Sequence, residues 1–179
     1  MNKKRLILSQ PLLDVILARL SQEIIENNGD MKEAVIIGLQ PRGVFLAERI
    51  VANLKQTLNF EVPYGVLDAT FYRDDFRRRD SMLTPNSTRI DFVIENKKVI
   101  LIDDVLATGR MVRAAIDALQ AFGRPNKIEL LCLIDRSYSR DLPIQPDYVG
   151  RRVNTQKTQR VLVEWTNQGY KADKIWLMD

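Results

Sequence analysis

The sequence contains no histidine and only one cysteine, and these absences limit the chemistry open to it. Without histidine there is no Ser-His-Asp triad, no Cys-His pair and no imidazole ligand for zinc. Cys132 has no partner for an internal disulfide, and its apolar neighbours Leu131 and Leu133 predict a buried side chain. Catalysis must therefore rely on carboxylates, cations, backbone dipoles or a hard metal ion such as Mg2+.

Long apolar runs are also missing. No stretch approaches the roughly 20 apolar residues that span a bilayer, and the basic start at residues 1–5 is not followed by the apolar segment of a signal peptide. These features predict a cytoplasmic protein. The 179 residues, 45% of them hydrophobic, predict one domain over residues 1–179 with its own core. The net charge of +4 indicates a mild preference for anionic partners.

Short apolar runs alternate with amphipathic segments along the chain. Buried strands are expected at residues 34–39, 62–68, 99–102, 128–134 and 161–163, and an edge strand at 90–94. Helices are expected from Gln10 to Asn28 with Ser9 as N-cap, after Gly43, and from near Thr108. This alternation predicts an α/β fold with a mainly parallel sheet, in which ligands bind beyond the carboxyl ends of the strands.

The segment VILIDDVLATGRM, residues 99–111, carries the chemistry. It places Asp103 and Asp104 at the end of a strand and Thr108-Gly109 at the start of a helix. A helix start binds phosphate through its free N–H groups, and glycine allows close approach. The two carboxylates would repel that phosphate, so they need hydroxyl groups or Mg2+. A ribose 5-phosphate satisfies both halves, whereas a solvated acidic pair that caps a helix would explain only one.

With this segment, the sequence resembles the type I phosphoribosyltransferases, whose signature for phosphoribosyl pyrophosphate (PRPP) is a strand, an acidic pair and a Thr-Gly loop. Residues 38–44 resemble the family's pyrophosphate loop, and residues 68–75 resemble the start of its flexible catalytic loop. Residues 134–136 and 142–151 are similar to one branch, the PyrR proteins. These are uracil phosphoribosyltransferases that in some bacteria also regulate pyrimidine operons by binding messenger RNA. The resemblance covers nearly the whole chain and implies a single-domain phosphoribosyltransferase fold with a small hood and a flexible loop.

The resemblance implies a role for each matching residue. Asp103 and Asp104 would hold the ribose hydroxyls, and Arg73 would close over the leaving group with the flexible loop. Pyrophosphate would be held by Pro41, Arg42 and Gly43. The rest of the PRPP-binding set would be Val105, Leu106, Ala107, Thr108, Gly109, Arg110 and Met111, the last five around the 5′-phosphate. The hood around the base would contain Asp135, Arg136, Tyr148, Val149, Arg151 and Val153.

The implied reaction is the transfer of the phosphoribosyl group of PRPP to uracil, which makes UMP and pyrophosphate in pyrimidine salvage. Mg2+ would enter with PRPP, and the protein would form a homodimer or homotetramer. Two alternatives stay open: a nucleotide-responsive RNA-binding regulator of pyrimidine operons, and a phosphoribosyltransferase for a purine base. An activity panel with different bases separates the enzyme hypotheses, and RNA binding tests the regulator.

Two further segments bear on these alternatives. RNA-binding members of the family use a basic face on the first helix, but the matching positions here are Ala18, Gln22 and Asn27. None of them carries a positive charge, which predicts weak RNA binding because phosphate contacts dominate such affinity. Residues 71–87 have few apolar side chains and clustered charges, including a run of arginines at 77–79, which predicts a solvated, mobile loop.

Overall fold

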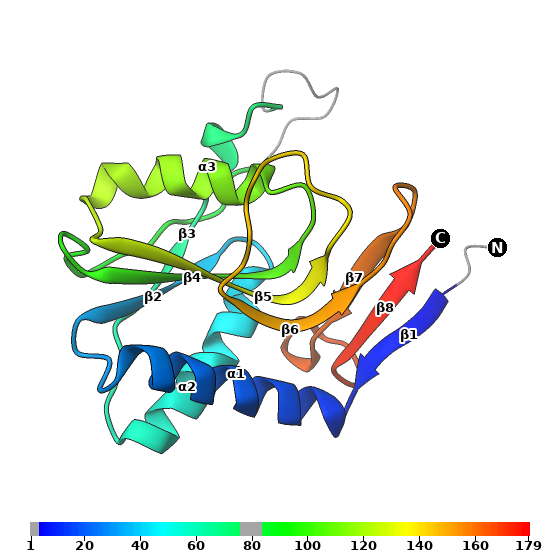
Figure 1. The fold of residues 1–179 in the computed structure, drawn as a ribbon, viewed down its shortest axis with the longest axis horizontal. Helices are drawn as coiled ribbons and strands as arrows, with labels where there is room; N and C mark the ends of the chain where they lie inside the picture. Colours follow the sequence, from blue (N-terminus) through cyan, green and yellow to red (C-terminus); the bar gives the residue numbers. More distant parts are fainter. Residues whose placement is uncertain (1–3, 76–83) are drawn as a thin grey trace.

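The computed structural model describes residues 4–75 and 84–179 and shows an α/β architecture (Figure 1). Five parallel strands form the central sheet in the order β3-β2-β4-β5-β6. They are β2 (Ala34–Leu39), β3 (Tyr64–Leu67), β4 (Lys98–Leu106), β5 (Lys127–Arg136) and β6 (Tyr148–Val153). Helices α1 (Leu12–Asn28) and α2 (Gly43–Leu58) cover one face of this sheet, and α3 (Arg110–Leu119) covers the other (Figure 1). The predicted α/β fold with a mainly parallel sheet is confirmed.

A second, smaller sheet is built from the two ends of the chain. Its antiparallel strands lie in the order β1-β8-β7 and comprise β1 (Lys4–Ser9), β7 (Arg160–Glu164) and β8 (Lys174–Met178). It lies to one side of the central sheet, next to β6 (Figure 1). Short 3-10 turns follow β3, α3 and β7; these are η1 (Thr70–Tyr72), η2 (Gln120–Phe122) and η3 (Thr166–Gln168).

The central strands are continuous apolar runs because helices cover both faces of their sheet. All six residues of β2 are buried. The core has two parts, one between the sheet and α1–α2 and one between the sheet and α3. Cys132 lies in the second part, where burial raises the pKa of its thiol, so the predicted buried cysteine is confirmed. Within the described part of the chain, no helix is both long enough and apolar enough to cross a membrane.

Three local expectations from the sequence need correction. Helix α1 begins at Leu12 with Pro11 at the N-cap position and no side-chain cap, because Ser9 belongs to β1. Residues 90–94 form no strand: the segment is anchored by one bridge between Val66 and Arg89 and by burial of Ile94. Strand β4 also does not stop before the acidic pair, since it stays paired with β5 as far as Leu106.

Candidate active site

The acidic pair lies in the carboxyl-terminal part of β4. Oδ1 of Asp103 accepts a hydrogen bond from the backbone N–H of Asp104 at 2.9 Å, and Oδ1 of Asp104 accepts one from Val105 N–H at 2.8 Å. Oδ2 of Asp104 is buried and has no hydrogen-bond partner among the described residues. An unpaired buried acceptor costs free energy in the folded protein, so such an atom points to a ligand group that completes it.

The charges of this pair are poorly stabilised by the protein alone. Burial and the neighbouring Asp104 raise the pKa of Asp103 well above its ordinary value. Burial also raises the pKa of Asp104, although the positive charge of Arg42 partly opposes this. A ligand that donates hydroxyl protons or supplies positive charge would lower both pKa values again.

The loop between β2 and α2 comes close to the acidic pair because Gly43 has no side chain. A Cβ atom at this position would lie 2.4 Å from the carbonyl oxygen of Ile102 and 3.0 Å from Cα of Asp103. Glycine therefore lets the start of α2 rest directly on β4. Arg42 directly precedes Gly43. The exposed Arg42 therefore lies close enough to Asp104 for its positive charge to act on the pKa of that carboxyl group.

The loop between β4 and α3 has the backbone form of a phosphate site. Gly109 precedes α3 with φ +87°, a left-handed conformation that glycine adopts readily, and a Cβ there would lie 3.2 Å from Ile144. The N–H groups at the start of α3 have no partner within the helix, and its dipole favours negative charge. The Thr108 hydroxyl stands at the same turn and accepts a hydrogen bond from Arg110 N–H at 3.3 Å.

The expected catalytic loop starts beside this phosphate loop. Arg73 forms an ion pair with Asp75 at 2.8 Å, which raises the pKa of Arg73. Both residues line a cavity of about 280 Å³ together with Asp74, Thr108, Arg110 and Met111. Residues 76–83, with the arginines at 77–79, lie outside the described residues, so the mobile loop stays a prediction.

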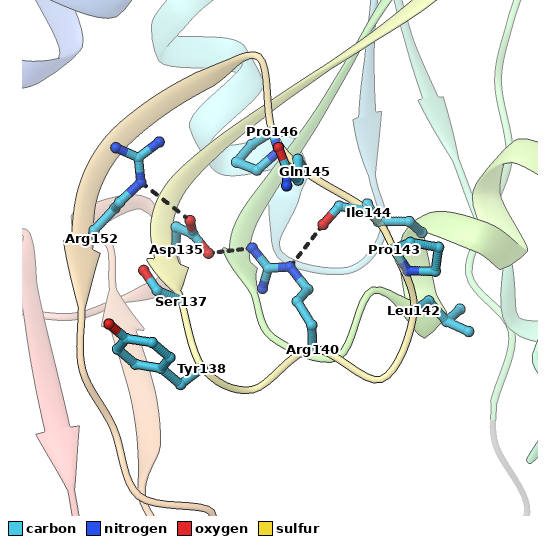
Figure 2. Close-up of a pocket in the computed structure, with 10 residues that line it drawn as sticks. All are labelled: Asp135, Ser137, Tyr138, Arg140, Leu142, Pro143, Ile144, Gln145, Pro146 and Arg152. Carbon is cyan, nitrogen blue, oxygen red and sulfur yellow. Dashed lines mark hydrogen bonds and ion pairs between the residues drawn. The ribbon is translucent and has the colours of Figure 1, made fainter.

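A larger cavity of about 580 Å³ lies beyond the carboxyl end of β5 (Figure 2). Asp135 is only 4% exposed and stands between two arginines. Arg140 forms an ion pair with Asp135 from one side, and Nε of Arg152 lies 3.6 Å from its Oδ2 on the other. The remaining lining residues are Ser137, Tyr138, Leu142, Pro143, Ile144, Gln145 and Pro146.

Of the six residues expected in the hood, Asp135 lines this cavity and the other five do not. The side chain of Tyr148 extends away from this cavity toward the start of β5, where its hydroxyl donates to Glu129 at 2.6 Å and accepts from Asn28 at 3.0 Å. It is a buried core residue in this structure, because β6 begins beside the middle of β5 and only its far end reaches the cavity.

The other four residues contact structural elements. Arg136 donates to Thr155 and to the carbonyl of Gln159, and burial lowers its pKa. Arg151 donates to the carbonyl of Ile7 in β1. Two apolar residues pack against the core, namely Val149 on the α3 side and Val153 on the side of α1 and α2.

The sequence alone assigns no specific role in this cavity to Arg140 or Arg152, although Arg152 lies within the segment expected to form the hood. Arg152 reaches Asp135 because the two residues are paired in register across β5 and β6. Arg140 reaches it from the loop that follows β5. The register of parallel strands depends on contacts between distant segments, so no local sequence signal reveals the first of these pairs.

Comparisons with protein families and known proteins identify similar phosphoribosyltransferases. The family model described as "Phosphoribosyl transferase domain" matches residues 6–168. The "Bifunctional protein PyrR" of Caldicellulosiruptor bescii is 51% identical over 147 residues, which cover 82% of this chain and 80% of the relative. The protein with the same description in Listeria welshimeri is 40% identical over 178 residues, covering 98% and 97%.

Solved structures show the same fold at low identity. A hypoxanthine phosphoribosyltransferase from Staphylococcus aureus matches with a TM-score of 0.69 and 18% identity, covering 96% of this chain and 90% of that one. The HGPRT-ase from Leishmania tarentolae in complex with GMP matches with a TM-score of 0.71 and 14% identity, covering 98% and 97%. At these identities the likeness concerns the fold alone.

Proposed function

The chain belongs to the phosphoribosyltransferase domain family and, within it, to the PyrR family, and from this premise we propose that it transfers the phosphoribosyl group of PRPP to uracil. The products are UMP and pyrophosphate, which is a salvage reaction for pyrimidines. The observation that carries the proposal is Oδ2 of Asp104, which has no partner among the described residues and lies on the strand that leads into the start of α3. A ligand with hydroxyl groups next to a phosphate completes both features.

The residues at the carboxyl edge of the sheet have complementary tasks in this reaction. The bond between C1 of the ribose and a pyrophosphate oxygen breaks, the bond from C1 to N1 of uracil forms, and the N1 proton passes to an oxygen of the leaving pyrophosphate. Asp103 and Asp104 bind the ribose hydroxyls, while the loop at residues 107–111 binds the 5′-phosphate. Arg42 and Arg73 offset the negative charge that grows on the leaving pyrophosphate. Closure of the loop that begins near Arg73 excludes water from the reacting sugar.

The acidic pair also fits Mg2+ that arrives with PRPP. This ion takes oxygen ligands and is usually held by one or two carboxylates together with substrate phosphates. Asp104 offers a buried carboxylate oxygen that no described residue uses. No group of three metal-ligating side chains occurs among the described residues, so we propose that the substrate supplies the remaining ligands. When bound, Mg2+ neutralises charge on the pyrophosphate.

The cavity beyond β5 supports a base with an N–H group next to a carbonyl. Asp135 can accept from the N–H, and the neighbouring Arg152 can donate to the carbonyl oxygen. Uracil has this edge, and so do hypoxanthine and guanine. This edge therefore does not distinguish uracil from a purine base, and an experiment must separate the two alternatives.

The test is an activity panel with PRPP, Mg2+ and one of uracil, hypoxanthine, guanine or orotate. We expect turnover with uracil to exceed turnover with each of the other bases by at least about 100-fold, the discrimination that shape and hydrogen-bond differences in a pocket supply. Preferred turnover of a purine base would contradict the proposal and favour the purine alternative. No turnover with any base would favour a pocket that only senses nucleotides.

The regulator hypothesis has one structural feature in its favour. A groove of about 510 Å³ between β1, β6 and β8 is lined by Arg5, Arg151 and Arg152. These cations could contact the phosphates of an RNA strand.

A cytoplasmic location and a homodimer or homotetramer stay predictions, and sedimentation at several protein concentrations tests the assembly.

A further inference from the structure

Arg140 connects three segments of the candidate active site. It belongs to the loop between β5 and β6, and its side chain is 20% exposed. Nη1 donates to the carbonyl of Ala107 at 2.6 Å, and Nε donates to the carbonyl of Ile144 at 2.8 Å. Nη2 forms the ion pair with Asp135 that Figure 2 shows. One guanidinium thus joins the proposed phosphate loop to two parts of the cavity for the base.

The two loops touch at other points as well. The backbone N–H groups of Asp141 and Leu142 donate to the carbonyl of Thr108 at 3.0 and 3.1 Å. The side chain of Ile144 fills the space beside Gly109. These contacts leave the phosphate loop and the cavity wall little freedom to move independently. Arg140 is the charged side chain that binds both of them.

We propose that Arg140 is a positioning residue that couples binding of the 5′-phosphate to binding of the base. It fixes the Ala107 carbonyl, and with it the turn that leads into α3, in an orientation that depends on the wall of the base cavity. This inference rests on the proposed function, because it assigns the phosphate and the base to these two places. Arginine suits the task since its planar fork donates to several acceptors at once, which a lysine ammonium does not reproduce.

The coupling can be measured with two ligands that do not react together. Ribose 5-phosphate lacks the pyrophosphate leaving group, so it can be titrated with and without saturating uracil. In the wild-type protein we expect uracil to strengthen ribose 5-phosphate binding by at least about 5-fold, the lower end of coupling between sites. The variants are Arg140→Met, Arg140→Lys and, as a surface control, Arg160→Met.

The two Arg140 variants should separate coupling from simple loss of structure. Arg140→Lys keeps a cation beside Asp135 and should bind uracil within about 3-fold of wild type, while the ratio of the two ribose 5-phosphate affinities falls toward 1. Arg140→Met should lose the coupling and also weaken uracil binding. Arg160→Met should match wild type. Melting temperatures show whether each variant is folded.

Each result bears on a different claim. Wild-type coupling in a folded Arg140→Met or Arg140→Lys variant would overturn the positioning role. If the wild-type protein binds ribose 5-phosphate but not uracil, the proposed function fails, and the same titration with the base that turns over still decides the role of Arg140.

Discussion

At the scale of single residues, Asp104 is expected to contribute to ligand binding and little to the stability of the fold. Its buried Oδ2 has no partner among the described residues, and burial raises its pKa, so the free protein gains little from the charge. We predict that Asp104→Asn lowers turnover with PRPP by at least about 100-fold, the cost of one preorganised contact in a site. The melting temperature should stay at or above that of the wild type. Near-normal turnover in the folded variant would show that the residue is not part of the site.

The pH dependence of stability is predicted to rest in part on Glu129. Burial alone would raise its pKa, but hydrogen bonds from Lys127 and Tyr148 outweigh burial and hold the pKa at about 2, below the ordinary 4.5. A depressed acid pKa adds stability above the unfolded-state value, and this stability is lost as the pH falls through the folded-state value. We predict that Glu129→Gln lowers the free energy of unfolding at pH 7 by roughly 3 kcal/mol.

Urea unfolding at a series of pH values tests this prediction. The difference between wild type and Glu129→Gln should shrink steadily between pH 4.5 and pH 2. Glu61→Gln is the control, because Glu61 is exposed and its only ion pair among the described contacts spans 3.5 Å to Lys55. A difference that stays constant with pH would show that the carboxylate charge is not the cause.

The sequence predicts local geometry well where the residues lie in one short continuous segment. The acidic pair and the Thr108-Gly109 turn lie within one strand-loop-helix unit, and the structure brings Arg42 beside that unit. The sequence does not predict which residues line the cavity beyond β5, because the position of Tyr148 depends on where β6 starts along β5. Local pattern cannot fix that register.

At the scale of elements, the same division holds. Strand β2 forms with the expected bounds because its six apolar residues suit a strand buried on both faces. The small sheet could not be predicted as a unit, since β1 and β8 pair across nearly the whole length of the chain. The edge strand at 90–94 failed because burial of Ile94 and a single bridge satisfy that segment without a ladder.

The small sheet is predicted to depend on Arg49 of α2 for its attachment. The guanidinium lies 4.1 Å from the ring centre of the buried Trp165 and forms an ion pair with Asp173 at 3.0 Å. Removing one partner of a buried pair leaves the other charge uncompensated. We predict that Arg49→Met lowers the free energy of unfolding by roughly 3 kcal/mol.

Fluorescence quenching follows the same attachment directly. In a Trp176→Phe background the emission comes from Trp165 alone, and Arg49→Met should make it more accessible to acrylamide. Lys55→Met, which removes an exposed ion pair, should change stability by less than about 1 kcal/mol and leave quenching unchanged. Equal quenching in all three proteins would mean that the sheet is held by other contacts.

At the scale of the whole molecule, the net charge is only +4, and several arginines already form hydrogen bonds or ion pairs within the protein. The basic residues Arg19, Arg140, Arg151 and Arg152 are candidates for contact with RNA phosphates, but Arg140 and Arg152 contact Asp135 in the cavity beyond β5. Arg19 donates to the carbonyls of Val149 and Gly150, and Arg151 donates to Ile7. Each of these four arginines therefore already contacts a protein acceptor.

We therefore predict weak binding of pyrimidine leader RNA at physiological salt. Ala18, Gln22 and Asn27 are exposed on α1 and bring no positive charge to the face that RNA-binding relatives are expected to use. The double change Gln22→His with Asn27→Arg should strengthen binding and steepen its salt dependence. Filter binding with and without UMP tests this. Tight, sequence-selective and UMP-enhanced binding by the unmodified protein would rank the regulator beside the enzyme.

The central claim is that one nucleotide spans the acidic pair, the phosphate loop and the cavity beyond β5. A crystal structure of the protein with UMP tests it most directly. The account predicts the phosphate at residues 107–111, the ribose hydroxyls at Asp103 and Asp104, and the uracil ring beside Asp135. A phosphate bound instead in the groove of Arg5 and Arg151, or a uracil ring outside the cavity, would contradict it.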